Sequence, residues 1–267
     1  MWCIPELTPE YVERMENLLE LYEKPLDPEE PVVCLDEKPV QLVKECREPM
    51  LADKPGKILK RDSEYIRNGT ANVFCVVEPR AGRHMTEATK NRKSPQFAKT
   101  LEKLSRAYPG ARTVHLVMDN LSSHRSANAL TKLYGEEHGK QIWGKFTVHY
   151  TPKHGSWLNQ AEIECGLVGR QCLGKDRVGD LESLQKRICA WNERANRDCI
   201  KINWRFTVEK ARKKFNYRRR CGRRRPAAFG LRLRRLSLTG VQPARSSLLA
   251  SPQNRPAKVA VMSRSED

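Results

Sequence analysis

Two aspartates in this sequence directly follow apolar runs, where a charged side chain needs an explanation. Asp36 closes the run Val-Val-Cys-Leu-Asp, and Asp119 closes His-Leu-Val-Met-Asp. An ionised carboxylate at the end of a buried strand is costly unless it is solvated, paired or bound to a cation, and strand ends are where open α/β sheets build their sites. Each aspartate alone could simply cap a turn. Two in the same context, with Asn120 beside the second, favour a functional site.

A third acidic feature lies where a loop rich in small and basic residues leads into a predicted helix. Glu162 and Glu164 fall in the first turns of that helix, and Lys153 and His154 lie in the loop before it. The two glutamates differ by about 200° around a helix, so only one of them can face a shared site. Periodicity does not choose between them, and acids in a first turn can also serve the helix dipole alone.

The elements that must position these residues alternate between strands and helices along the chain. Strands are predicted at 31–36, 71–79, 113–118 and 146–150, with a hairpin partner for the second at 83–89. Helices are predicted at 9–23, 94–107, 125–138, 158–172, 181–195 and 207–216. The polar, proline-interrupted segment 44–70 is predicted to be mostly loop. This order predicts a mixed α/β sheet covered by helices.

Charge is distributed unevenly along the 267 residues. The net charge is +18, and residues 218–267 hold thirteen basic residues against two acids. That Arg-rich segment has little apolar content and no sustained period, so we expect it to be disordered. The remaining chain is moderately basic, which suggests an anionic partner such as nucleic acid. A soluble protein with an ordinary excess of lysine has a similar composition.

Cysteine usage and the absence of long apolar segments bear on the compartment. The nine cysteines form no C-x-x-C pair, a pattern that indicates free thiols in a reducing compartment. The first residues lack the apolar core of a signal peptide, and no segment is long enough for a transmembrane helix. We therefore expect a soluble, intracellular protein that does not contact a membrane.

Four segments carry a specific resemblance to a known family. In chain order they are VVCLDEKPVQL, YIRNGTANVF, HLVMDNLSSH and HYTPKHGSWLNQAEIE. With these strings the chain resembles the DDE domain of insertion-sequence transposases of the IS630 group, which belongs to the wider Tc1/mariner superfamily. The similarity runs from about residue 2 to 217 and includes RQCL at 170–173 and INWRFTVEKARKKF at 202–215. The resemblance implies an RNase H-like fold, in which a mixed sheet is flanked by helices.

The resemblance also assigns roles to the acids. It places the first catalytic acid at Asp36 and the second at Asp119. A Leu-Asn-x-x-Glu match at 158–162 places the third at Glu162, with Glu164 as the alternative. The implied chemistry is phosphoryl transfer with two Mg²⁺ ions, for which Mn²⁺ can substitute. Asp36 would bridge both ions, while Asp119 and Glu162 would each bind one.

Other residues are expected to support this chemistry. His124 matches a histidine typical of the family, although a lone histidine can equally be structural, and Asn120 lies beside the second acid. Lys38, Lys153 and His154 are expected to contact DNA phosphates, and each could instead be a solvated surface residue.

The expected domain organisation is an N-terminal helix and linker at 1–28, a catalytic domain at 29–217 and the Arg-rich tail at 218–267. Family members carry a helix-turn-helix region before the catalytic domain, and residues 1–28 offer one helix only. Recognition of transposon ends is therefore expected to be missing or supplied by another chain. The tail departs from the family, and either translation in another frame or a role as a nonspecific DNA-binding arm would fit its composition.

Three functions remain open on this basis. The first is a metal-dependent transposase domain that cleaves and joins DNA at transposon ends. The second is a truncated remnant, inactive in transposition, that retains nonspecific DNA binding. The third is a non-catalytic protein that binds DNA through charge alone. For the first, the expected partners are transposon and target DNA and a second copy of the chain in a homodimer. The expected location is the bacterial cytoplasm, at the nucleoid when DNA is bound.

Overall fold

Six strands form one mixed sheet in the computed structural model of the chain, which describes residues 6–50, 60–119 and 123–217. The described residues all belong to the first of two compact units, Met1–Arg218 and Arg219–Asp267, and the predicted tail at 218–267 lies outside them. The strands are β1 (Val32–Glu45), β2 (Tyr65–Glu78), β3 (Arg83–His84), β4 (Glu87–Thr89), β5 (Val114–Met118) and β6 (Phe146–Tyr150). Their order is β3-β2-β1-β5-β6, and β4 also pairs with β2.

The sheet is antiparallel on one side of β1 and parallel on the other. β2 pairs antiparallel with β1, β3 and β4, whereas β1, β5 and β6 run parallel. All five residues of β5 are buried, as expected for a central parallel strand covered on both faces. The predicted fold class, a mixed α/β sheet flanked by helices, is confirmed.

Seven α-helices are described in the structure. They are α1 (Pro9–Glu23), α2 (Ser94–Ala107), α3 (Ser123–Tyr134), α4 (Glu136–Gly144), α5 (Ala161–Leu167), α6 (Leu181–Arg197) and α7 (Val208–Phe215). Thr8, Asp180 and Thr207 accept hydrogen bonds from the first turns of α1, α6 and α7, so each of these helices begins at a capping side chain. A π-helical segment, Val168–Leu173, continues α5. Among the described residues, no helix has the length and apolar character needed to cross a membrane.

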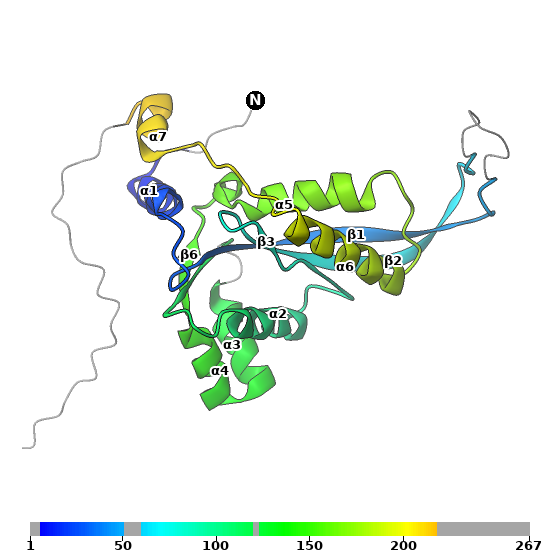
Figure 1. Ribbon diagram of the computed structural model, residues 1–267, viewed down its shortest axis with the longest axis horizontal. Coiled ribbons are helices and arrows are strands. Elements are labelled where there is room, and N and C mark those ends of the chain that lie inside the picture. The colour runs from blue at the N-terminus through cyan, green and yellow to red at the C-terminus, as the bar shows by residue number, and fades with distance from the viewer. Residues whose placement is uncertain (1–5, 51–59, 120–122, 218–267) are drawn as a thin grey trace, which may run out of the picture. The chain divides into compact units, whose positions relative to one another are not determined.

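Helices cover both faces of the sheet (Figure 1). Helices α2, α3 and α4 pack on one face, where Val33 and Leu35 of β1 enter the hydrophobic core. Cys34 points to the opposite face, into a second core formed with α1 and α7. Helix α6 and the end of α5 cover the rest of that face in a third core. The alternation along β1 follows the two-residue period of a strand.

The structure corrects the predicted strand lengths and one helix. β1 continues to Glu45 and β2 begins at Tyr65, within the segment predicted as loop. Residues 65–70 of β2 are exposed, so this strand segment has no apolar alternation to reveal it. The helix predicted at 125–138 is two helices, because Gly135 interrupts it with a φ of 84° that glycine adopts without strain.

Candidate active site

Asp36 lies within β1. The sequence had suggested instead that it lies at the end of a strand. β1 pairs with β5 only over Val32–Cys34 and then continues beside β2 alone. Cys34 is paired with Val117, so Asp36 and Asp119 each lie two residues beyond this last parallel pair. Because β5 ends at Met118, it does not pair with β1 beside Asp36. Two aspartates thereby meet where the parallel pairing stops.

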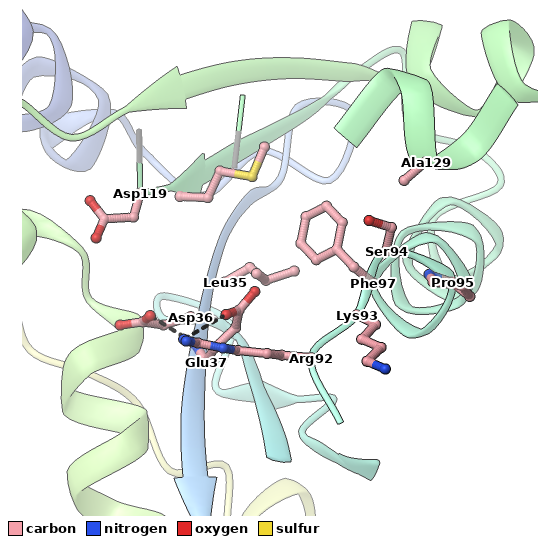
Figure 2. A pocket seen from close by; sticks show the side chains of 11 residues that line it. Leu35, Asp36, Glu37, Arg92, Lys93, Ser94, Pro95, Phe97, Asp119 and Ala129 are labelled. Atoms are coloured by element: carbon pink, nitrogen blue, oxygen red, sulfur yellow. Dashed lines mark hydrogen bonds and ion pairs between the residues drawn. The ribbon is translucent and has the colours of Figure 1, made fainter. Parts of the chain in front are cut away.

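A cleft of about 780 Å³ opens beside these aspartates. Figure 2 shows Asp36 and Asp119 on one side of the cleft and the start of α2 on the other. Glu37 adds a third carboxylate to the lining, and Arg92 and Lys93 add two basic residues from the segment that leads into α2. The Arg92 guanidinium lies 3.7 Å from a carboxylate oxygen of Glu37. The cleft thus has an acidic wall, and the Arg92 side chain reaches it.

The electrostatics of the acidic wall disfavour ionisation of Asp36. Burial is the largest cause, and the charges of Glu162, Asp119 and Glu37 add to it, so that the pKa of Asp36 rises from 3.8 to about 6. The backbone N–H of Glu37 opposes this rise by donating to Asp36 Oδ1 at 2.7 Å. Burial also raises the pKa of Glu37, while the charge of Arg92 lowers it. Glu37 thus has Arg92 as a partly compensating positive charge, whereas burial and neighbouring acids dominate at Asp36.

Carboxylates of this kind fit a hard divalent cation. Mg²⁺ prefers oxygen ligands and commonly uses only one or two carboxylates beside phosphate and water. A bound cation would supply the charge that the raised pKa of Asp36 shows to be missing. In the described part of the chain, no three His, Cys, Asp or Glu side chains lie close enough together to form a ready-made set of metal ligands.

Asp119 is held in place by the end of the neighbouring strand. Thr151 directly follows β6, as Asp119 follows β5, and its side chain is buried. Its hydroxyl donates to Asp119 Oδ1 at 2.5 Å, and its backbone N–H donates to the carbonyl oxygen of Met118. One carboxylate oxygen of Asp119 is thus engaged in a hydrogen bond to the sheet.

Glu162 is an exposed residue in the first turn of α5. The start of this helix is tied to β1 by the buried Asn159, whose side-chain amide donates to the carbonyl oxygen of Leu35 at 2.9 Å. The side-chain Oδ1 of Asn159 in turn accepts from the backbone N–H of Ala161 at 3.1 Å. Since Leu35 precedes Asp36, Asn159 links the segment that carries Glu162 to the segment that carries Asp36.

Glu164, the alternative third acid, points into the protein interior. Its side chain is fully buried and lies 3.0 Å from Nδ1 of His84, which is also fully buried. Burial lowers the pKa of His84, but its hydrogen bond to Glu164 and the charge of that carboxylate raise it above the ordinary value. Glu162 and Glu164 therefore occupy different environments, which the helical pattern of the sequence had left undecided.

The structure does not bring the predicted DNA-contacting residues to the wall of the acidic cleft. Lys153 and His154 are exposed and line a separate hollow of about 370 Å³, together with Tyr11 and Arg14 of α1. Lys38 is half-buried on β1 and extends beside Gly169 in the π-helical segment.

Two predicted supporting residues cannot be placed against the site. Asn120 lies outside the described residues. The structure describes the backbone of His124, which belongs to α3, but not its side chain.

Sequence reasoning missed several residues at the site. Thr151 could have been found, because it follows a predicted strand in the same way as Asp119 follows its own. Arg92 and Lys93 precede a predicted helix start at Ser94-Pro95, and nothing in their spacing connects them to Asp36. Asn159 was noticed only as part of a family motif, since its hydrogen bond to Leu35 joins residues far apart in the sequence.

Residues 31–185, more than half of the chain, match the family described as DDE superfamily endonuclease. No curated protein matches the chain.

Among solved structures, the chain is similar to Mos1 mariner complexes. They include a pre-cleavage Mos1 transpososome (19% identity, TM-score 0.47, covering 80% of this chain and 64% of that chain). The Mos1 mariner paired end complex with Mn is 18% identical, with a TM-score of 0.46, over 81% of this chain and 63% of that chain. The Mos1 strand transfer complex is 20% identical, with a TM-score of 0.40, over 75% and 63%. The chain spans less than two thirds of these Mos1 chains.

Proposed function

The chain belongs to the DDE superfamily endonucleases, and from this membership we propose that it is the catalytic domain of a DNA transposase. In this proposal the domain cleaves DNA at transposon ends and joins them to target DNA. The observation that carries the proposal is the meeting of Asp36 and Asp119 beyond the Cys34–Val117 pair. The charge of Glu162 also acts on Asp36 there.

Asp36, Asp119 and Glu162 are the proposed catalytic acids and the proposed ligands of two Mg²⁺ or Mn²⁺ ions. When bound, the ions would activate a water or a 3′-hydroxyl and stabilise the leaving oxygen of an in-line displacement. The chain's own contribution is to hold the acids in place. Thr151 fixes one oxygen of Asp119, and Asn159 ties the start of α5 to the strand of Asp36.

The basic residues of the same cleft suit the DNA backbone. Arg92, whose guanidinium lies beside Glu37, and Lys93 line the cleft together with Asp36 and Asp119, within reach of a phosphodiester that enters it. Cationic side chains there would hold the phosphates flanking the scissile bond and offset their charge against the acidic wall. Lys38, Lys153 and His154 lie away from the cleft lining and are proposed as contacts for more distant DNA.

The proposed subgroup is the IS630 group of the Tc1/mariner superfamily, supported by the four strings that carry the resemblance. A homodimer on DNA and a location at the bacterial nucleoid in the cytoplasm belong to the same proposal. A transposition-inactive remnant that binds DNA without cleaving it is the second candidate. The strongly basic segment 218–267 favours it, because charge alone supports nonspecific binding.

A cleavage assay with the full chain tests the proposal. The substrate is a plasmid that carries the inverted repeats flanking the coding locus, incubated with Mg²⁺, Mn²⁺ or EDTA. We expect metal-dependent nicking of this plasmid that Asp119→Asn abolishes. The matched control is Asp198→Asn, which changes an exposed aspartate at the end of α6, and it should cleave like the wild type. DNA binding without cleavage in either metal would instead identify the remnant.

A further inference from the structure

Glu164 is a fully buried acid with two hydrogen-bond partners, although it lies only two residues from a proposed catalytic acid. Both carboxylate oxygens lie 3.0 Å from Nδ1 of His84. Thr86 donates a further hydrogen bond from its hydroxyl to Oε1 at 2.9 Å. The side chains of Glu164 and His84 are both fully buried. Glu164 is thus occupied by partners from the β3 edge and is closed to solvent and to DNA.

His84 is anchored on both of its ring nitrogens. Nε2 lies 2.9 Å from the carbonyl oxygen of Ile200, which can only accept a hydrogen bond, so Nε2 carries a proton. Nδ1 faces the carboxylate of Glu164. The ring also meets Trp191 edge-on, with the ring centroids 5.3 Å apart. His84 therefore has one orientation, and it presents a fixed partner to Glu164.

The backbone around His84 and Thr86 is held by two amides of α6. Asn196 exchanges two hydrogen bonds with the backbone of His84, at 2.8 and 2.9 Å. Asn192, one helical turn earlier, does the same with the backbone of Thr86. These amides complete the edge of the sheet in the way that a further strand would. His84 and Thr86, the partners of Glu164, are thus held in place by hydrogen bonds from α6.

The helix that carries Glu162 needs such an anchor. α5 has only seven residues and passes into a π-helical segment, so its own hydrogen bonds define its rotation weakly. Residues two apart on a helix differ by about 200°, so that an inward Glu164 turns Glu162 outward. Asn159 ties down the start of the helix, and Glu164 fixes its rotation.

The chemistry of the pair also indicates a role in orientation. A buried ion pair seldom stabilises a fold more than well-packed apolar side chains of the same volume. The pair instead fixes the orientation of α5, because the hydrogen bonds of His84 and Thr86 are satisfied in one position of this helix only. An apolar side chain at position 164 could fill the same space in several rotations of the helix.

We propose that Glu164, His84 and Thr86 form a buried node that positions Glu162 for metal binding. Glu164 is then a positioning residue and not a ligand. The inference rests on the proposed function, since it requires that Glu162 bind the metal.

Two substitutions of the same glutamate separate positioning from ligation. In Glu164→Gln, the amide can still accept from Thr86 and can donate to Nδ1 of a neutral His84, so the node is retained. In Glu164→Ala, both contacts are lost. A metal ligand would behave differently, because replacing a carboxylate with an amide removes the charge that binds the ion. Glu162→Gln serves as the reference for that behaviour.

The experiment measures Mn²⁺ affinity by electron paramagnetic resonance and DNA cleavage under single-turnover conditions, with thermal unfolding as the check on folding. We expect Glu164→Gln to bind Mn²⁺ and cleave within about 3-fold of the wild type, and Glu164→Ala to lose about 10-fold or more in both. The DNA concentration for half-maximal rate should not change. Thr86→Val, a milder change, should weaken Mn²⁺ binding in the same direction if Glu164→Ala does not fold. Glu182→Ala, at an exposed residue, is the control.

Two results would overturn the inference alone. One is a Glu164→Gln variant as inactive as Glu162→Gln, which would make Glu164 a ligand. The other is a folded Glu164→Ala or Thr86→Val variant with unchanged Mn²⁺ affinity. A wild-type chain that neither binds Mn²⁺ nor cleaves DNA contradicts the proposed function, and this inference with it.

Discussion

Thr151 donates a hydrogen bond from its hydroxyl to Oδ1 of Asp119 at 2.5 Å, across the ends of two neighbouring parallel strands. Because Thr151 is fully buried, the bond is shielded from water and holds the carboxylate in one rotamer. Asp119 itself lines the cleft. Thr151, which has no catalytic chemistry of its own, thereby orients the carboxylate of a proposed metal ligand.

Replacing Thr151 with valine should slow DNA cleavage while leaving the chain folded. Valine has nearly the same shape, so packing is retained, but Asp119 loses its only hydrogen bond to the end of β6. We expect the single-turnover rate to fall by about 10-fold and the free energy of unfolding to fall by about 1 kcal/mol. Thr151→Ser restores the donor and should recover most of the rate. Wild-type cleavage by the valine variant would show that Asp119 does not depend on this bond.

Asp36 should make the stability of the metal-free protein depend on pH. Its pKa is raised from 3.8 to about 6 in the folded chain, so the folded state keeps a proton that the unfolded state has already released. The stability that this proton contributes is complete below pH 3.8 and is lost as the pH rises through about 6. Asp36→Asn stays uncharged and avoids the loss.

The measurement compares urea unfolding of Asp36→Asn and wild type in EDTA from pH 4 to pH 8. The variant's advantage should grow across the window and level off above pH 6, at about 1–2 kcal/mol after allowance for solvent screening. Adding Mg²⁺ at pH 8 should stabilise the wild type and have little effect on the variant. A stability difference that does not change with pH would contradict the raised pKa.

The strands and helices that carry the site were largely predictable, because they are buried on at least one face. The helices at 9–23 and 94–107 and the strand at 146–150 have the predicted bounds, since apolar periodicity and capping residues act locally. The long hairpin of β1 and β2 was not predictable in the same way. The outer end of β2 is exposed at residues 65–70, and an exposed strand leaves no apolar pattern in the sequence.

The residue types of the candidate site were predictable, but the hydrogen bonds and packing contacts that place them were not. Asp36 and Asp119 were singled out by their positions after apolar runs, even though Asp36 turned out to lie inside a strand. The environments of Glu162 and Glu164 could not be distinguished, because the difference depends on His84, eighty residues away in the chain. Arg92 enters the cleft only through the packing of α2 against the sheet.

Arg92 and Lys93 should contribute to DNA binding through charge. Replacing either one with glutamine removes one proposed phosphate contact, so DNA affinity should fall and its dependence on salt should weaken by about one unit of log–log slope. The cleavage rate at saturating DNA should change little. Binding is measured by fluorescence anisotropy at salt concentrations of about 50 to 300 mM, where the logarithm of affinity falls linearly with the logarithm of salt concentration. Lys99→Gln is the matched control, since Lys99 is exposed on α2 but does not line the cleft, and an equal loss in that variant would point to general charge instead.

Asn159 should matter more for activity than its single side chain suggests, because it joins the two segments that carry Asp36 and Glu162. Asn159→Ala leaves the carbonyl oxygen of Leu35 and the backbone N–H of Ala161 without their partner in the interior. We expect the free energy of unfolding to fall by about 1–3 kcal/mol and cleavage to fall by about 10- to 100-fold. Asn203→Ala removes an exposed amide and should change neither quantity. If Asn159→Ala loses stability but cleaves at the wild-type rate below its melting temperature, the link from β1 to α5 serves folding only. A rate loss that persists at low temperature, where the variant is fully folded, would instead show that the start of α5 must be fixed for Glu162 to act with Asp36.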